Sequence, residues 1–536
     1  SHNGMLSLPT AASYYGGIPV EIYDISASGK NMTFSVSFGW RLSTGYSGEN
    51  HINACSVDFD GDGGPELVYP QPDGAIHIFK DELPLPGFPL YRDPIEYTYV
   101  WDGIDFYFPM QVENLARLYR LSSSGGEYLH TFGNKRWATH PLSDDNILYL
   151  PLNDVNSQAS WIYQYEPGEA GVDALIEFEY PIISNLAWFR DQLYIPSRQE
   201  SMFCVWQLAP NYPMIADCRL LDVPSDSTVV AVFVAPITPQ NPSSQGEVIV
   251  QCLNSIYAFD SNNNLLPGFP YVHDLRSTAP LSIEDWDVNG TLDLLISSDR
   301  GVAVIDYAGS RMSPAALNLA ASDSLAFSSG VLAADIDHDG KKELLGSFGF
   351  NRLHCWEDNF RAKPGYPVSF GRRSRNLPFI APGSDGLIYA WLASDDGSIY
   401  RQALPEASLA DLQSGWNAEY GSLLRQASRD GSEFPNQYET TELFVPGEFY
   451  IFPNPLKSIY AQQLTLNVMT SRDTALEVKI FDINGSLIYR QSSTAKAWLR
   501  NRDVIDLPAD RLRSGVYICV VSGDRDSRSI KFAVEK

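Results

Sequence analysis

The stretch Asp58-Phe59-Asp60-Gly61-Asp62-Gly63-Gly64-Pro65-Glu66-Leu67 returns in closely related form at residues 285–294 and 335–344. In each copy, oxygen-bearing side chains stand at positions 1, 3 and 5, a glycine at position 6 and a carboxylate at position 9. Glycine allows the sharp turn with which such a loop can wrap around an ion, and about six to eight oxygens suit a hard cation such as Ca²⁺. The pattern therefore predicts three acidic loops, each able to hold one calcium ion.

The predicted ligands are the side chains at positions 1, 3, 5 and 9 and the backbone carbonyl at position 7. They are Asp58, Asp60, Asp62, Gly64 and Glu66 in loop 1, Asp285, Asp287, Asn289, Thr291 and Asp293 in loop 2, and Asp335, Asp337, Asp339, Lys341 and Glu343 in loop 3. An EF-hand would need flanking helices and a glutamate at position 12, which is Tyr69, Ile296 or Gly346 here. The flanks are instead short apolar runs typical of strands, so we expect up to three structural calcium ions between strands.

A longer repeat surrounds these loops. The chain continues from loops 1 and 3 through a strand to Pro86-Gly87-Phe88-Pro89 and to Pro364-Gly365-Tyr366-Pro367. A third such turn, Pro267-Gly268-Phe269-Pro270, follows a strand whose upstream loop, residues 236–245, has lost the acidic pattern. That copy is expected to lack the metal. Loops 2 and 3 begin at residues 285 and 335, 50 residues apart, and a period of this length is typical of propeller blades made of short strands.

Loops and turns together resemble the FG-GAP or integrin-α-like calcium-loop propellers, which also include the VCBS repeats of bacterial secreted proteins. The resemblance covers residues 51–90 and 245–372. It implies an all-β fold with a β-propeller over residues 41–430. Dividing residues 40–415 by a period of about 50 gives seven or eight blades, and we expect seven, with eight as the alternative. The ring would close near Ser398–Arg401.

Residues 446–536 carry a second resemblance. Phe452-Pro453-Asn454-Pro455 precedes strands of alternating polarity, Asn484-Gly485 predicts a hairpin turn, and Ser514-Gly515-Val516-Tyr517 begins a further strand. These motifs and the basic end resemble a type IX secretion C-terminal sorting domain, here expected as a small β-sandwich after a linker at 431–445. The resemblance implies that the type IX machinery is a partner and that the protein is secreted or held at the outer cell surface.

Residues 1–40 are expected to form a strand segment or linker, with strands around Gly16–Ser26 and Asn31–Val36. They resemble segments that join secreted immune-inhibitor-A-like metalloproteases to their C-terminal modules. On this alternative, the chain is the accessory tail of a larger protein whose catalytic part lies upstream.

Charge and cysteine content restrict the partners and the chemistry. Lys and Arg number 38 against 65 Asp and Glu, a net charge of −27, which should repel nucleic acid and anionic membranes. No apolar run reaches the ~18 residues that a transmembrane helix needs, so no transmembrane segment is expected. Cys204 and Cys218 flank a short turn, and the sequence is compatible with a disulfide between them or with two free thiols.

No catalytic or cofactor-binding residue can be singled out. The eight histidines include no HExxH pair, and neither a GxSxG elbow nor a phosphate-binding glycine loop is present. We therefore expect a non-catalytic binding or adhesion module for an extracellular glycan or protein. Besides the metalloprotease tail, a propeller polysaccharide lyase or hydrolase is the alternative. Asp, Arg and Tyr side chains converging in a cleft would favour that enzyme, and a shallow aromatic surface would favour the binding module.

Overall fold

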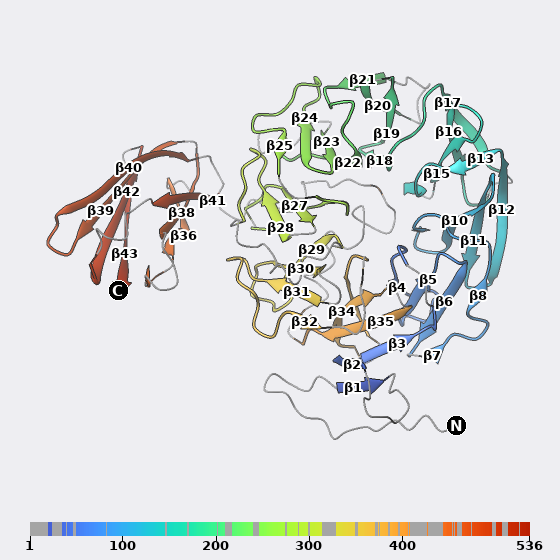
Figure 1. Cartoon of the computed structure of the whole chain (residues 1–536), viewed down its shortest axis with the longest axis horizontal. Coiled ribbons are helices and arrows are strands. Elements are labelled where there is room, and N and C mark those ends of the chain that lie inside the picture. Colours follow the sequence, from blue (N-terminus) through green and yellow to red (C-terminus); the bar gives the residue numbers. More distant parts are fainter. Residues whose placement is uncertain are drawn as a thin grey trace, which may run out of the picture. The chain divides into compact units, whose positions relative to one another are not determined.

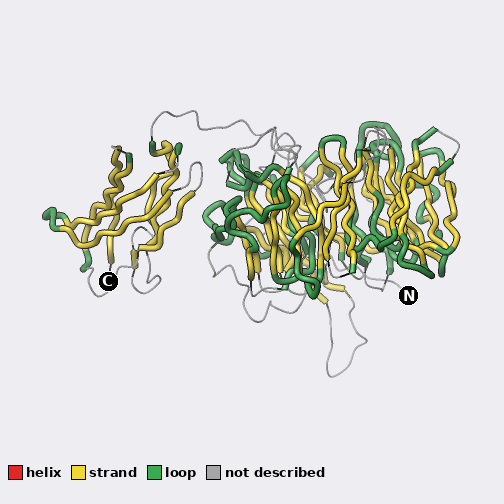
Figure 2. Tube along the Cα trace, turned by 90° about the horizontal axis from the view of Figure 1, so that it is seen from above, coloured by secondary structure: helices red, strands yellow, loops and turns green. Residues whose placement is uncertain are grey.

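The computed structural model describes the chain as an all-β protein. It describes residues 20–23, 35–38, 40–46 and 50–535, except 82, 145–146, 169–170, 201, 210–216, 239–245, 274–275, 288, 299–300, 314–328, 349–351, 370–373, 375, 384–385, 395–396, 406, 408–425, 427–442, 453, 455, 458–463, 473, 496–499, 506–512 and 525. These residues contain strands and loops but no helix, as the tube in Figure 2 shows, and therefore no helix that could cross a membrane. The all-β class is confirmed.

Eight antiparallel sheets are described between residues 40 and 403. Following the chain, the first sheet contains β4 (Cys55–Val57), β5 (Glu66–Pro70), β6 (Ala75–Lys80), β7 (Leu83–Pro84) and β8 (Leu90–Tyr91). The second contains β9 (Val100–Trp101), β10 (Phe106–Val112), β11 (Leu115–Ser122) and β12 (Gly125–Gly133). The third contains β13 (Lys135–Trp137), β14 (Leu142–Asp144), β15 (Ile147–Asp154), β16 (Ser160–Tyr165) and β17 (Asp173–Phe178). The fourth contains β18 (Ala187–Phe189), β19 (Gln192–Gln199), β20 (Met202–Leu208) and β21 (Asp217–Leu221).

The remaining four sheets complete the series. The fifth contains β22 (Val229–Ala235), β23 (Glu247–Cys252), β24 (Ser255–Phe259) and β25 (Tyr271–Val272). The sixth contains β26 (Ser282–Glu284), β27 (Asp293–Ser298) and β28 (Gly301–Ile305), and the seventh β29 (Val331–Ala334), β30 (Glu343–Phe348), β31 (Arg352–Trp356) and β32 (Val368–Ser369). The eighth contains β33 (Phe379–Pro382), β34 (Ile388–Ala393), β35 (Ser398–Ala403) and, from the start of the chain, β3 (Trp40–Ser43). In Figure 1 the eight sheets follow one another around a ring, from blue to orange.

Pairing between β3 and β35 closes this ring, near the residues expected from the sequence. Leu42 lies opposite Ile399, and the backbone N–H of Thr44 donates to the carbonyl of Gly397 at 2.9 Å. A strand from the N-terminal side thus completes the sheet formed by the last three strands. Apolar side chains fill the spaces between neighbouring sheets: Tyr149 of β15, for example, shares a buried cluster with Leu193 of β19.

Buried side-chain amides bridge several neighbouring sheets. Asn185, just before β18, donates to the carbonyl of Val232 in β22 at 2.7 Å and accepts from the Val232 N–H at 2.9 Å. Asn153 of β15 makes the same reciprocal pair with Ile182, near the fourth sheet. Gln251 of β23 bonds Ala279 and Leu281, just before β26. These amides satisfy backbone groups that the sheets leave unpaired, and so they set the spacing of adjacent sheets.

The three Pro-Gly-aromatic-Pro turns have matching backbone contacts. In all three copies, the residue before the motif donates its backbone N–H to a carbonyl of the preceding strand. These bonds are Leu85 to Ile78 at 2.8 Å, Leu266 to Ala258 at 2.8 Å and Lys363 to Cys355 at 2.9 Å. The predicted repeat is therefore also a structural repeat, shared by the first, fifth and seventh sheets.

A second compact unit is formed mainly by residues 434–536. One of its sheets has the order β36 (Phe444–Phe452), β38 (Leu464–Thr470) and β41 (Arg500–Ile505). The other has the order β37 (Leu456–Lys457), β43 (Asp526–Glu535), β42 (Gly515–Gly523), β39 (Thr474–Asp482) and β40 (Leu487–Ala495). Leu466 of the first sheet and Val478 and Cys519 of the second belong to one buried cluster. The hairpin predicted at Asn484-Gly485 is confirmed, because β39 and β40 pair on either side of it.

Three smaller expectations concern single segments. The predicted N-terminal strand pair is confirmed as β1 (Val20–Tyr23) and β2 (Ser35–Phe38). Cys204 of β20 and Cys218 of β21, left open by the sequence, form a disulfide between neighbouring strands, with 6.3 Å between their Cα atoms. Most of the predicted linker at 431–445 lies outside the described residues, as does the acid-poor stretch 239–245.

Candidate functional site

The three acidic loops occupy the same place in their sheets. Each connects the first strand to the second: loop 1 joins β4 to β5, loop 2 joins β26 to β27, and loop 3 joins β29 to β30. Within each loop, three carboxylates bring oxygens within 4.8 Å of one another; the groups are Asp58, Asp60 and Asp62, then Asp285, Asp287 and Asp293, then Asp335, Asp337 and Asp339. These clusters could hold metal ions, and the sequence predicted their members from spacing alone.

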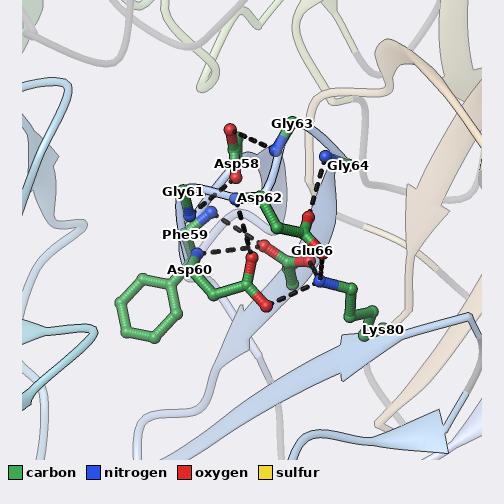
Figure 3. Close-up of polar contacts among 9 residues, drawn as sticks. All are labelled: Asp58, Phe59, Asp60, Gly61, Asp62, Gly63, Gly64, Glu66 and Lys80. Carbon is green, nitrogen blue, oxygen red and sulfur yellow. Dashed lines mark hydrogen bonds and ion pairs between the residues drawn. The ribbon is translucent and has the colours of Figure 1, made fainter.

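Each loop is shaped by bonds from its own backbone to its acidic side chains. In loop 1, the two oxygens of Asp58 accept from the N–H groups of Gly61 at 2.9 Å and Gly63 at 3.0 Å, as Figure 3 shows. In loop 3, Asp335 accepts from Asp339 and Gly340 in the same way. The glycine at position 6 has a φ of 83–89° in all three loops, a region that side chains rarely adopt. Protein groups therefore supply part of the bonding that shapes these loops.

The residue at position 9 begins the second strand of each sheet, and the two oxygens of its carboxylate have different surroundings. One oxygen accepts the backbone N–H of position 2: Phe59 to Glu66 at 2.8 Å, Trp286 to Asp293 at 3.2 Å, and Ile336 to Glu343 at 3.0 Å. This bond ties the two ends of the loop together. The other oxygen is the one left to face a cation, and its surroundings differ among the three loops.

A lysine ammonium reaches that second oxygen in loops 1 and 3. Lys80 Nζ lies 3.2 Å from Glu66 Oε1 and also contacts Asp60 and Asp62, as drawn in Figure 3. Lys363 Nζ lies 3.4 Å from Glu343 Oε1 and contacts Asp337. Both lysines were missed in the sequence, because neither has a fixed spacing from the acidic motif.

Loop 2 is the most buried of the three. Its three clustered carboxylates are all buried, whereas those of loop 1 are exposed. Asp293 is fully buried, and its Oδ1 has no hydrogen-bond partner. Burial, and then the charges of Asp287, Asp285 and Asp306, raise the pKa of Asp293 well above its usual range. Burial also raises the pKa of Asp306 to about 6. Bringing negative charge into this site without a cation is therefore unfavourable.

The acid-poor copy in the fifth sheet keeps the position-9 carboxylate, which the sequence analysis overlooked. Glu247 begins β23, and its Oε2 accepts the N–H of Ile237 at 2.8 Å, as Glu66 does from Phe59. Its other oxygen accepts the hydroxyl of Thr238 at 2.6 Å. A usable signal was the spacing to the turn motif: Glu66 and Glu247 each precede the first proline of their turn, Pro86 or Pro267, by 20 residues.

An aromatic and cationic surface joins the first two sheets. Tyr91 of β8 is 68% exposed and Tyr128 of β12 is 41% exposed. Between them, the guanidinium of Arg92 lies 5.3 Å from the ring centre of Tyr119 and donates to its hydroxyl at 2.8 Å. Arg117 lies 5.5 Å from the ring centre of Tyr128. We call Tyr91, Arg92, Arg117 and Tyr128 the tyrosine–arginine surface; Tyr119, which Arg92 contacts, is itself buried, and Arg117 is also paired with Asp93 at 2.7 Å.

Comparison with known proteins identifies the C-terminal unit. Residues 450–535 match the family described as secretion system C-terminal sorting domain. This tail marks the protein for export. It indicates handling by the type IX system and a final place outside the cell, either released or on the cell surface, as the sequence predicted. None of the curated proteins matches the chain, and no FG-GAP or VCBS family match is found, so that resemblance stays a prediction.

Solved structures with repeated β-sheets are similar over most of the chain but at low identity. Sqt1 from Saccharomyces cerevisiae has a TM-score of 0.49 at 10% identity, over 69% of this chain and 99% of that one. The quinohemoprotein alcohol dehydrogenase from Comamonas testosteroni has a TM-score of 0.47 at 8% identity, over 69% and 76%. The extracellular domain of BT3049 from B. thetaiotaomicron has a TM-score of 0.35 at 10% identity, over 96% and 62%. We draw no functional conclusion from them.

Proposed function

We propose that this protein is an exported, calcium-stabilised β-propeller that binds a glycan or a protein outside the cell and does not itself catalyse a reaction. We interpret the eight sheets of residues 41–430 as eight blades, the alternative to the seven expected from the repeat length. Residues 446–536 are proposed to be a sorting domain built as a β-sandwich, an interpretation supported by its two sheets and their common core.

The observation that carries the calcium assignment is the environment of Asp293. A fully buried carboxylate oxygen without a hydrogen-bond partner, next to Asp285 and Asp287, is a costly arrangement unless a cation is present. The donor set consists of carboxylates, an amide and backbone carbonyls, which suit a hard cation with flexible coordination such as Ca²⁺. In this proposal the fifteen residues predicted at positions 1, 3, 5, 7 and 9 hold the ions.

Calcium would act on the structure of the ring. Each ion would join the loop between two strands to the first residue of the second strand, and it would neutralise carboxylates that otherwise repel one another. The extracellular space, to which the sorting domain directs the protein, is rich in calcium. Export and metal binding therefore support the same proposal.

Ligand binding is supported by the tyrosine–arginine surface. The exposed rings of Tyr91 and Tyr128 offer apolar faces for a sugar ring or an aromatic side chain. The guanidinium groups offer hydrogen-bond donors, and they are oriented by the neighbouring rings and, for Arg117, by an ion pair with Asp93 at 2.7 Å. From the sequence, a shallow aromatic surface was expected for a binding module and a cleft with converging Asp, Arg and Tyr for an enzyme; the exposed tyrosines support the first.

A glycan and peptide array with the full chain, in calcium and in chelator, tests the proposed binding. We expect binding to a defined class of probe, reduced at least about tenfold by Tyr91→Ala combined with Tyr128→Ala, since aromatic anchors at interfaces contribute about 2 kcal/mol or more. Leu220→Ala, which removes an exposed apolar side chain in the fourth sheet, is the matched control. Binding that is equally strong in the double variant would contradict the assignment of the surface.

A further inference from the structure

Lys80 and Lys363 reach equivalent carboxylates from different places in the repeat. Lys80 ends β6, directly after Phe79, which lies opposite Leu67. The corresponding residue after β31 is Glu357, because Trp356 lies opposite Leu344. Lys363 instead stands immediately before its Pro-Gly-Tyr-Pro turn, in the place held by Leu85 in the first sheet, as the matching backbone bonds to Cys355 and Ile78 show.

Simple repetition of one blade sequence therefore does not account for the two lysines. They arise at separate positions, yet both ammonium groups lie 3.2–3.4 Å from the second oxygen of the position-9 glutamate. Each also contacts at least one position-3 aspartate, Asp60 or Asp337. In both loops, a positive charge on the protein occupies the space toward which the proposed metal ligands point.

A divalent ion and an ammonium group cannot share this space without strong repulsion. Like charges a few ångströms apart repel one another strongly at a protein surface, and calcium carries two charges. A lysine side chain can relieve this repulsion by turning outward, because its stem is long and flexible. Lys80 is well placed to do so, since its side chain is already 28% exposed.

We infer that Lys80 and Lys363 are built-in competitors of calcium, which balance the charge of loops 1 and 3 at low calcium and leave when the metal enters. This inference rests on the proposed function, in which the loops bind calcium. It predicts unequal sites. Loop 2, where Asp293 Oδ1 has no hydrogen-bond partner, fills first, and loops 1 and 3 fill at higher calcium in exchange for the lysines.

Calcium titration of the full chain by calorimetry tests this inference. The wild type should show one tight and two weaker sites. Lys80→Met and Lys363→Met should each make one weak site tighter by about tenfold or more, because the competing charge is gone. The matched control is Lys135→Met, which removes an ammonium that lies over the ring of Trp161 in a sheet without an acidic loop, and it should titrate like the wild type.

Thermal unfolding gives an independent readout. Without calcium, both lysine variants should melt below the wild type, since the carboxylates lose their counter-charge. In saturating calcium, they should melt at or above it. A variant that is less stable by the same amount in both conditions would mean that the lysine is only structural, and it would overturn the inference.

The outcomes distinguish a failure of the competitor role from a failure of the calcium assignment on which it rests. If the wild type binds calcium but the lysine variants bind it equally or more weakly, the competitor role is wrong and the calcium sites stand. If neither the wild type nor any variant binds calcium, the proposed calcium assignment itself is wrong, and the inference falls with it.

Discussion

The loop before β23 and the loop before β27 differ in what contacts the carboxylate that begins the next strand. Both place a buried carboxylate at the start of the second strand, and both use one oxygen to accept a backbone N–H from position 2 of the loop. For the second oxygen, Glu247 has the hydroxyl of Thr238 at 2.6 Å, whereas Asp293 has no hydrogen-bond partner and lies in a cluster of buried aspartates. One copy satisfies both oxygens of its carboxylate with protein atoms, whereas in our proposal a cation satisfies the second oxygen of the other.

This difference separates the bond that every copy of the loop makes from the contact that varies among the copies. The bond between the position-9 carboxylate and the position-2 N–H is present in all four copies, so it belongs to the fold. The partner of the second oxygen varies: lysine for Glu66 and Glu343, threonine for Glu247 and, in our proposal, calcium for Asp293. In our proposal, metal binding is therefore an addition to a loop whose closing bond is made by protein atoms.

The largest expected effect comes from Asp293→Asn, which keeps the shape of the side chain and removes its charge. In calcium, loss of a buried ligand should lower the free energy of unfolding by about 3 kcal/mol or more. In chelator the sign should reverse, because the variant no longer buries a carboxylate whose pKa is raised by burial and by its acidic neighbours. Denaturant unfolding in both conditions measures this.

Glu247→Gln is the matched control for that experiment, since it makes the same charge-removing change in the copy without acidic neighbours. Its effect should be the same in calcium and in chelator. A calcium-dependent effect at Glu247, or a calcium-independent one at Asp293, would break the comparison between the two loops.

A smaller effect is expected from Thr238→Val, which removes the hydroxyl that bonds Glu247 Oε1. Leaving a buried acceptor without its donor should cost about 1–3 kcal/mol. Because no metal is proposed at this copy, the cost should be equal with and without calcium, which thermal unfolding in the two buffers can check. If calcium restores the stability of this variant, the fifth sheet also holds an ion and the distinction between the copies is wrong.

The smallest expected effect is on pH dependence. Burial raises the pKa of Glu247 above its ordinary value of 4.5 in the folded protein. The folded state then binds this proton more tightly than the unfolded state, so stability is greatest at or below the ordinary value and falls as pH rises through the raised pKa. Glu247→Gln should flatten this part of the stability curve. An unchanged slope in unfolding measured across that pH range would show that the residue does not contribute to it.

Spacing in the sequence predicted those features whose residues lie near one another along the chain. The acidic clusters, the three proline-rich turns, the hairpin at Asn484-Gly485 and the sorting domain each depend on residues within a short stretch, where local geometry decides the outcome. The positions of all three acidic clusters therefore follow from the spacing of the motif alone.

Features whose residues have no fixed spacing from the acidic motif could not be predicted in the same way. Lys80 and Lys363 act at the same place but stand at different distances from their loops, so no spacing rule finds both. Glu247 was hidden because its loop lost the aspartates that define the motif. The number of sheets was ambiguous because residues 91–244 lack the turn motif and their repeat had to be inferred from its length.

Thermal unfolding of the full wild-type chain, first in chelator and then after calcium is added back, tests the central claim most directly. Calcium that binds only the folded state should add about 2.7 kcal/mol of stability for each site when its free concentration is about 100 times the Kd. We therefore predict that the Tm falls in chelator and returns when calcium is restored. A Tm that is the same in both conditions would contradict the account of the acidic loops as calcium sites.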